Sequence, residues 1–366
     1  MPTIICEFAF NRAPAIYYSG EQVSGKVALT TMKDLEVEVL QINCKGVANV
    51  SWYARARQSP YIEYNDGADE HQKLQYQGHE VYVDETRPLH KHATIYAGRH
   101  EYKFSFNLPA NCPATSTHHK FGEISYSISL LLKRDAKFDN KFEQRFVVKK
   151  RLNLNVNVNK YMTPVLKSHY LKNIDTEVHF SIPHTGYVPG QDIKFRLDAA
   201  PTATVVLRYI RCKVRLCLKY TFRCQQPSAE SKEIIWKLAT AKFSYGNKSQ
   251  KSNSFESSLH LPLMTPITSE QKPPAIICVS YYLEALVFTK QKLLLTKLCI
   301  PITVGSKALK NISDSSCDLG YFCYDNFKVE NISTARILSE AHQKAISNKF
   351  ALTASFVRNI DHSVTE

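Results

Sequence analysis

Hydrophobic and polar residues alternate along most of the chain with a period of two. In residues 102–108, four apolar positions are separated by Lys, Ser and Asn, and residues 124–132 repeat the pattern. The strictest alternation lies in residues 152–159, where four aliphatic residues alternate with four asparagines. A half-buried antiparallel strand requires this spacing, because one of its faces lies on a core and the other in water. Each of these segments is therefore predicted to be such a strand.

The same period continues through the second half of the chain. Apolar residues alternate in six further segments, at residues 178–182, 193–197, 214–218, 255–261, 279–283 and 298–304. No segment before about residue 330 has the 3.6-residue spacing of an amphipathic helix. Many short strands without intervening helices are typical of antiparallel β-sandwiches, since a parallel sheet needs helical crossovers. The predicted fold class is therefore all-β.

Segments of the first half recur in the second half in the same order. Each pair shares a turn or strand pattern. The pairs are 18–27 with 188–197, 106–109 with 259–262, and 124–132 with 277–287. Three matches in one order indicate two copies of the same sandwich.

The repeat defines the expected domain organisation. We expect a first sandwich in residues 1–160, a hinge in the polar stretch 161–175, a second sandwich in 176–305 and a tail in 306–366. Helical spacing of apolar residues in 335–353 predicts one short helix in the tail. The polar stretch between Arg55 and Asp84 is long for a hairpin loop, and one interpretation is that it extends as a ribbon.

The basic excess of the chain is unevenly distributed. The chain has 47 Lys and Arg against 33 Asp and Glu, a formal net charge of +14. Residues 161–305 hold 19 basic residues against nine acidic ones, whereas residues 1–160 hold 21 against 17. Such an excess raises the possibility of a module for anionic lipid or nucleic acid. A nucleic-acid module predicts salt-sensitive binding to bulk RNA or DNA, and we expect no nucleic acid partner.

Part of this excess forms a stripe on one predicted strand. Arg211, Lys213, Arg215 and Lys219 share one parity, while apolar residues hold the other. A strand would place these four cations on one face within about 27 Å, at ~3.3 Å per residue. They are candidates for binding phospholipid headgroups, inositol phosphates or a phosphorylated tail. The alternative is a solvated outer face that prevents edge aggregation.

Residue spacings that would indicate an enzyme or a metal site are missing from the sequence. None of the ten cysteines forms a Cys-x-x-Cys, and the 13 histidines show no spacing of a metal site or catalytic triad. Reduced, buried cysteines and surface histidines are the simpler interpretation. We therefore expect no enzyme, no cofactor and no metal. The first residues do not resemble a signal peptide, and the most apolar window, 274–288, is shorter than the ~20 residues that span a bilayer, which predicts a cytoplasmic protein.

Four segments carry motifs that are similar to those of a known protein family. Residues 17–29 (Tyr-Tyr-Ser-Gly-Glu-Gln-Val-Ser-Gly-Lys-Val-Ala-Leu) and 97–109 (Ala-Gly-Arg-His-Glu-Tyr-Lys-Phe-Ser-Phe-Asn-Leu-Pro) resemble signature stretches of the arrestin N-terminal domain. Residues 185–191 (Thr-Gly-Tyr-Val-Pro-Gly-Gln) and 276–282 (Ile-Ile-Cys-Val-Ser-Tyr-Tyr) resemble the arrestin C-terminal domain. The wording Ala-Gly-Arg-His-Glu is similar to that of arrestin domain-containing proteins, the α-arrestins.

The resemblance implies a structure and a function. It implies two tandem immunoglobulin-like antiparallel sandwiches and a short tail. It also implies a cytosolic adaptor, recruited peripherally to the plasma membrane or endosomes, that binds cytoplasmic tails of membrane receptors and transporters and links them to endocytic and ubiquitin-dependent sorting. Arrestins bind phosphates along the edge of the N-terminal domain, and the matching basic residues here are Arg12, Lys26, Lys149, Lys150 and Arg151.

Two family features are not matched. The sole Pro-Pro pair, Pro273-Pro274, is followed by Ala275 and Ile276, so the Pro-Pro-x-Tyr motif that binds WW domains is missing and ubiquitin ligases are expected only as indirect partners. The phosphate-sensitive latch of visual and β-arrestins needs an Arg near the end of the first sandwich and acids from a loop of the second. Residues 152–159 contain no Arg and residues 234–255 no Asp or Glu, so this latch is not expected.

Other interpretations remain open. Tyr324 and Phe327 match the Tyr-x-x-bulky pattern that clathrin adaptors read, and form a sorting-motif candidate, although four-residue matches often arise by chance. Retromer subunits share the arrestin fold, so a stable coat subunit is the alternative to a regulated adaptor. Co-purification distinguishes them, because a coat subunit stays in a stable complex with other sorting subunits.

Overall fold

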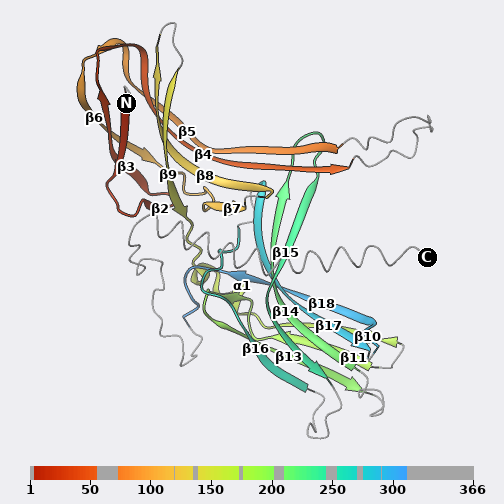
Figure 1. Ribbon diagram of the computed structural model, residues 1–366. Coiled ribbons are helices and arrows are strands. Elements are labelled where there is room, and N and C mark those ends of the chain that lie inside the picture. Colours follow the sequence, from red (N-terminus) through yellow and green to blue (C-terminus); the bar gives the residue numbers. More distant parts are fainter. Residues whose placement is uncertain are drawn as a thin grey trace, which may run out of the picture. The chain divides into compact units, whose positions relative to one another are not determined.

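The computed structural model describes residues 4–55, 73–118, 120–134, 139–172, 176–201, 210–244, 254–269, 275–289 and 291–310. Strands make up nearly all of the regular structure in these ranges, which confirms the all-β prediction (Figure 1). Among the helices described there, none has the length and apolar character to cross a bilayer. The helix expected at 335–353 and the Tyr324 and Phe327 motif lie outside the described residues.

The first part of the chain forms two sheets, which are antiparallel except for the parallel pair β2 and β9. Its strands are β1 (Ile4–Phe10), β2 (Ile16–Tyr18), β3 (Gln22–Thr31), β4 (Leu35–Arg55), β5 (Lys73–Ile95), β6 (Gly98–Asn107), β7 (Ser116–His118), β8 (Gly122–Lys133) and β9 (Asn140–Lys149). One sheet has the order β1-β3-β6 and the other the order β2-β9-β8-β4-β5, with β7 beside β8. The alternating residues of β8 are buried as predicted, from Ile124 to Leu132. They form a core with Phe104 and Phe106 of β6.

The second part repeats the arrangement. Its strands are β10 (Val165–Leu171), β11 (Thr176–Ile182), β12 (Gly186–Tyr187), β13 (Asp192–Pro201), β14 (Ile210–Arg223), β15 (Ser231–Ser244), β16 (Ser254–His260), β17 (Ile277–Thr289) and β18 (Leu294–Val304). The two sheets have the orders β10-β11-β13-β16 and β12-β18-β17-β14-β15. Within the second sheet, Val214, Leu216 and Leu283 are buried.

The repeat seen in the sequence is also a repeat of hydrogen bonds. Tyr126 of β8 donates its hydroxyl to the Pro113 carbonyl, and Tyr281, at the matching place in β17, donates to the Pro266 carbonyl. Each tyrosine is almost completely buried. A buried phenol needs an acceptor, so the same tyrosine satisfies the same requirement in both copies.

The strand predicted at residues 152–159 is wrong. The segment contains the 3-10 helix η1 (Leu154–Asn157) and the start of the short helix α1 (Val158–Met162). Asn153 caps the first turn by accepting from the Asn155 N–H at 3.0 Å, and the Asn155 side chain donates to the Ala308 carbonyl at 2.7 Å. Asparagine side chains compete with strand pairing for backbone hydrogen bonds. In this segment the side-chain hydrogen bonds form in place of strand pairing. Among the four aliphatic residues only Leu154 is fully buried, and it packs with Tyr161 and Leu309.

Part of the stretch expected as a hinge is strand. Residues 165–171 of β10 pair with β11 from Val165 opposite Ile182 to Leu171 opposite Thr176. Most residues of β10 are exposed, because it is the outermost strand of its sheet. Its polar sequence therefore reflects an edge position.

Candidate functional site

The first candidate site is built on the turn between β2 and β3. Gly20 has φ of +84°, a left-handed conformation that favours glycine. This turn brings the Glu21 carboxylate back to accept the Tyr18 N–H at 3.0 Å. The Tyr-Ser-Gly-Glu wording of the sequence motif therefore specifies a turn closed by a carboxylate.

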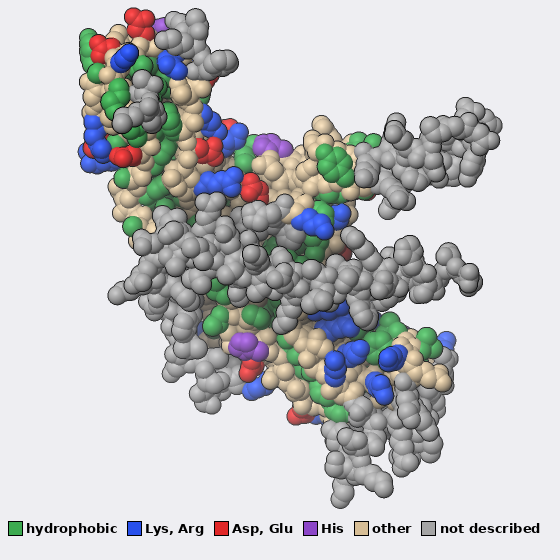
Figure 2. Space-filling model, viewed as in Figure 1, with side chains coloured by type: hydrophobic (Ala, Val, Ile, Leu, Met, Phe, Trp, Pro, Cys, Tyr) green, Lys and Arg blue, Asp and Glu red, His purple; other side chains and the backbone are tan. Residues whose placement is uncertain are grey.

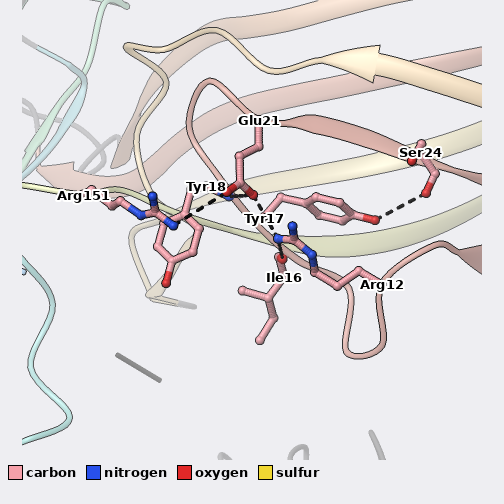
Figure 3. A network of polar contacts seen from close by, with 7 residues as sticks. All are labelled: Arg12, Ile16, Tyr17, Tyr18, Glu21, Ser24 and Arg151. Atoms are coloured by element: carbon pink, nitrogen blue, oxygen red, sulfur yellow. Dashed lines mark hydrogen bonds and ion pairs between the residues drawn. The ribbon is translucent and has the colours of Figure 1, made fainter. Parts of the chain in front are cut away.

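Two arginines converge on this carboxylate (Figure 3). Arg12 donates to Glu21 Oε2 at 2.9 Å and to the Ile16 carbonyl at 2.8 Å, while Arg151 Nη2 lies 3.7 Å from Glu21 Oε1. The Arg151 guanidinium lies 3.8 Å from the centroid of the Tyr18 ring. The Arg12 guanidinium lies 5.1 Å from the centroid of the Tyr17 ring. These ring contacts hold both arginines at the surface, where the side chains of Arg12 and Arg151 are 50% and 65% exposed.

The surroundings of Glu21 favour its ionised form. Burial alone would raise the pKa of the Glu21 carboxyl, but the Tyr18 N–H and the two arginines outweigh it, and the pKa is lowered. The carboxylate therefore stays charged at neutral pH, and two guanidiniums share one negative charge. A phosphate, with its larger charge and bidentate geometry, suits the same two guanidiniums.

The other predicted anion-binding residues of the first sandwich do not all lie near Glu21. Lys149 ends β9 opposite Tyr18, and its carbonyl accepts the Ser19 N–H at 2.9 Å, so its backbone lies beside the turn. Lys150 is the next residue and is half-buried. Lys26 lies on β3 with its ammonium 3.5 Å from Glu101, away from the turn.

The second candidate site is the outer face of the sheet that contains β14. Cys212, Val214 and Leu216 are buried, and the alternating Arg211, Lys213, Arg215 and Lys219 lie on the opposite face, as the sequence predicts. Figure 2 shows Lys and Arg side chains gathered over the region that β14, β17 and β18 occupy in Figure 1. The strand geometry predicted from parity is confirmed.

One buried carboxylate lies among these cations. Glu284 of β17 is directly opposite Arg215, and its side chain is only 6% exposed. It accepts from Arg215 at 3.2 Å and pairs with Lys297 of β18 at 2.8 Å. Burial would raise the pKa of Glu284, but Lys297 and Arg215 outweigh it and the pKa is lowered. Glu284 therefore fixes Arg215 and Lys297 on this face as an ionised partner.

The other cations of this face repel one another. Lys213 lies opposite Lys242 of β15, and its ammonium is 5.1 Å from the Phe288 ring centroid. Burial lowers the pKa of Lys213, and Arg215, Lys242, Lys292 and Lys237 lower it further. Lys219, farther along β14, has a separate partner in Glu233 at 2.8 Å. The candidate site is thus wider than the predicted stripe. We call it the basic face, composed of Arg211, Lys213, Arg215, Lys237, Lys242, Lys292 and Lys297.

The basic residues that neighbouring strands contribute to this face were not predicted from the sequence. Lys237 and Lys242 differ in parity, yet both lie near Lys213, because the pairing of β14 with β15 shifts register between Leu216 and Cys217. A β-bulge of this kind moves later side chains to the other face. The lysine spacing alone gives no signal of it. Within the described ranges, no group of three or more His, Cys, Asp and Glu residues is arranged to hold a metal.

Comparison with known proteins gives the chain its relatives. Residues 6–155 match the model of "Arrestin (or S-antigen), N-terminal domain" and residues 174–309 that of "Arrestin (or S-antigen), C-terminal domain". The chain belongs to the arrestin family. Its relatives include the arrestin domain-containing protein 17 of Caenorhabditis elegans, 24% identical over 323 residues that cover 82% of this chain and 70% of the relative.

Thioredoxin-interacting proteins are also relatives of this arrestin-family chain. That of Rattus norvegicus is 24% identical and that of Homo sapiens 23% identical, each over 250 residues and 64% of this chain. The match spans 58% of either relative's own length. The predicted resemblance to arrestin domain-containing proteins is confirmed. Arg12, Glu21 and Arg151 lie in the part that matches the N-terminal domain, and the basic face lies in the part that matches the C-terminal domain.

Proposed function

We propose that this arrestin-family chain is an adaptor that binds cytoplasmic tails of membrane proteins while its basic face rests on an anionic membrane surface. The observation that carries the proposal is the concentration of cations around Lys213, of which Glu284 pairs with two. Repulsion between them is relieved when anionic groups approach. Each cation near an anionic leaflet contributes about 1 kcal/mol, so several on one sheet face give useful binding.

The tail-binding role is assigned to the turn at Glu21. A phosphorylated side chain in a cargo tail competes with the Glu21 carboxylate for Arg12 and Arg151, which already lie within reach of one acidic group. Phosphate accepts bidentate hydrogen bonds from guanidinium and carries more charge than a carboxylate, so it has the advantage in this exchange. Lys149 and Lys150 add positive charge near the same turn.

Membership of the arrestin family supports a proposed cellular role. As an adaptor, the chain brings bound receptors or transporters to endocytic and ubiquitin-dependent sorting at the plasma membrane or endosomes. Because no Pro-Pro-x-Tyr motif occurs in the sequence, the adaptor reaches ubiquitin ligases through a further protein. No nucleic acid and no cofactor belong to this function.

Flotation with lipid vesicles tests the membrane part of the proposal. The full chain is mixed with phosphatidylcholine vesicles that contain either no anionic lipid or a few per cent of a phosphoinositide. We expect flotation only with the phosphoinositide, and its loss in the variant Arg211→Glu, Lys213→Glu, Lys242→Glu. This variant leaves Arg215 and Glu284 in place, so the ion pairs of the sheet are retained.

A matched control changes charge by the same amount elsewhere. Lys91→Glu, Lys103→Glu and Lys167→Glu replace three exposed lysines of β5, β6 and β10. We expect this control to float as the unchanged protein does. Equal flotation of the basic-face variant and the unchanged protein would contradict a membrane role for the face.

A further inference from the structure

Strand β4 runs beyond its neighbour β8. The register pairs β4 with β8 from Val39 to Val50, whereas it pairs β4 with β5 as far as Arg55, and Figure 1 shows both strands continuing past the end of β8. The last contact on the β8 side is the Ser51 N–H, which donates to the Phe121 carbonyl at 2.8 Å. Successive outward N–H groups on one side of a strand are two residues apart. The Tyr53 N–H therefore points to this same side, where the register of the described strands gives β4 no partner.

A groove lies beside this open stretch of β4. It has a volume of about 670 Å³, and its lining residues are Asn49, Val50, Ser51, Trp52, Tyr53, Lys120, Phe121, Gly122, Glu123 and Lys232. The Trp52 ring is stacked on the ring of Tyr76, with 5.6 Å between the two centroids. Tyr53 is 62% exposed. The groove thus combines a strand edge with aromatic walls.

Two lysines give the groove its charge. The Lys232 ammonium, from β15, is 4.2 Å from the Phe121 ring centroid and 6.0 Å from that of Trp52, while the Lys120 ammonium is 5.3 Å from the Phe121 centroid. Burial and the charge of Lys120 both lower the pKa of Lys232. The two ammonium groups therefore share one aromatic ring without a common counter-ion among the described residues.

One acidic residue also lines the groove. The Glu123 carboxylate faces the Arg145 guanidinium of β9, with 3.4 Å between Oε2 and Nη1. Its charge is thus compensated from outside the groove. Between described residues, neither Lys120 nor Lys232 forms a salt bridge that an entering anionic group would displace.

We propose that this groove binds an acidic peptide segment in extended conformation. The segment adds to the open edge of β4 beside Tyr53, pairs its carboxylates with Lys120 and Lys232, and packs a large apolar side chain against Phe121. A peptide fits these three features together, because it alone supplies a strand edge, alternating side chains and carboxylates at strand spacing. Nucleotides and lipid headgroups have no backbone to pair with the Tyr53 N–H.

The proposal goes beyond the adaptor function assigned above and does not rest on it. The groove shares no residue with the basic face or with the turn at Glu21. A failure of vesicle flotation therefore leaves peptide binding at the groove unaffected, and the reverse also holds. The two proposals are tested by separate probes on the same full chain.

Fluorescence anisotropy with a designed peptide tests the inference. The probe is a short fluorescein-labelled peptide that carries Glu, Phe and Glu at every second position, so that they share one face of the strand, and a second probe replaces each Glu with Gln. We expect the full chain to bind the Glu peptide at least about tenfold more tightly than the Gln peptide, because charge-assisted hydrogen bonds are lost in the second. Equal binding of the two peptides, or no binding of either, would overturn the proposal.

Variants of the chain locate the binding. Lys120→Gln with Lys232→Gln is expected to weaken Glu-peptide binding at least about tenfold, whereas the control Lys91→Gln with Lys103→Gln is expected to leave it unchanged. Tyr53→Pro removes the outward N–H without removing a hydrogen bond to β5, and it too is expected to weaken binding. Full binding by the double lysine variant would overturn the proposal, as would full binding by a folded Tyr53→Pro protein. Binding of phosphatidylserine vesicles with no binding of the Glu peptide would also contradict it.

Discussion

Each candidate site holds one carboxylate between two cations, and the two carboxylates differ in burial. Glu21, between Arg12 and Arg151, has a side chain that is 30% exposed, whereas that of Glu284, between Arg215 and Lys297, is 6% exposed. Water screens the first pair of contacts and hardly reaches the second carboxylate. The same arrangement of charges therefore leaves the carboxylate at the first turn open to water and encloses the one on the basic face.

The repeat supplies a second comparison at the same turn. Val188 N–H donates to Gln191 Oε1 at 2.9 Å, which matches the bond from Tyr18 to Glu21, and Gly190 has φ of +91° where Gly20 has +84°. A neutral amide thus closes the turn in the second copy as well as a carboxylate does in the first. The charge of Glu21 is not needed for the turn, and its role lies in holding Arg12 and Arg151.

Removing the buried carboxylate is expected to have the largest effect. Glu284→Ala leaves Arg215 and Lys297 without their partner, but their side chains are 21% and 45% exposed, so the cost should fall below the about 3–5 kcal/mol of a fully buried pair. Glu21→Ala, at an exposed pair, should cost less than about 1 kcal/mol. Chemical denaturation of the two variants measures both values. Equal losses would show that burial does not separate the two carboxylates.

The pH dependence of stability sharpens the same comparison. Because the folded pKa of Glu284 is lowered, its contribution is fully present above the unfolded carboxyl pKa, about 4.3, and disappears as the pH falls through the lower folded value. The difference in unfolding free energy between the unchanged protein and Glu284→Gln should be constant from pH 7 to pH 5 and shrink below about pH 4.3. A difference that grew on acidification would mean that the folded pKa is raised.

The smallest effect on stability is expected from Glu21→Gln. The amide keeps the turn, as Gln191 does, so the unfolding free energy should change by no more than about 0.5 kcal/mol. Arg12 and Arg151 then lose a competing charge, and binding of a phosphoserine peptide should strengthen severalfold. Gln191→Glu, the reverse change in the second copy, serves as the control and should leave phosphopeptide binding unchanged. Weaker phosphopeptide binding by Glu21→Gln would contradict the exchange of anions at this turn.

The periodicity of the side chains predicted those features that depend on a single strand. The parity of Arg211, Lys213, Arg215 and Lys219 identified the outer face of β14, since alternation within a strand is local. The turn at Gly20 was recognisable for the same reason. The all-β fold followed from many such local patterns together.

Contacts between distant segments could not be predicted in this way. The pairing of Glu284 with Arg215 depends on which strands become neighbours, and the approach of Lys237 and Lys242 depends on the bulge opposite Leu216 and Cys217. Residues 152–159 misled because their asparagines cap and bridge to Ala308 and Lys310, more than 150 residues away along the chain. The asparagines of this segment alternate with aliphatic residues because their side chains form hydrogen bonds, and not because the segment is a strand.

The central claim is that the two anion sites have separate ligands, and one crossed experiment tests it most directly. The variant Arg12→Gln, Arg151→Gln and the variant Arg211→Glu, Lys213→Glu, Lys242→Glu are each measured for phosphoserine-peptide binding and for phosphoinositide-dependent flotation. We expect the first to lose peptide binding about tenfold or more and to float normally, and the second to bind peptide normally and fail to float. Loss of both activities in either variant, or of neither in both, would contradict the account.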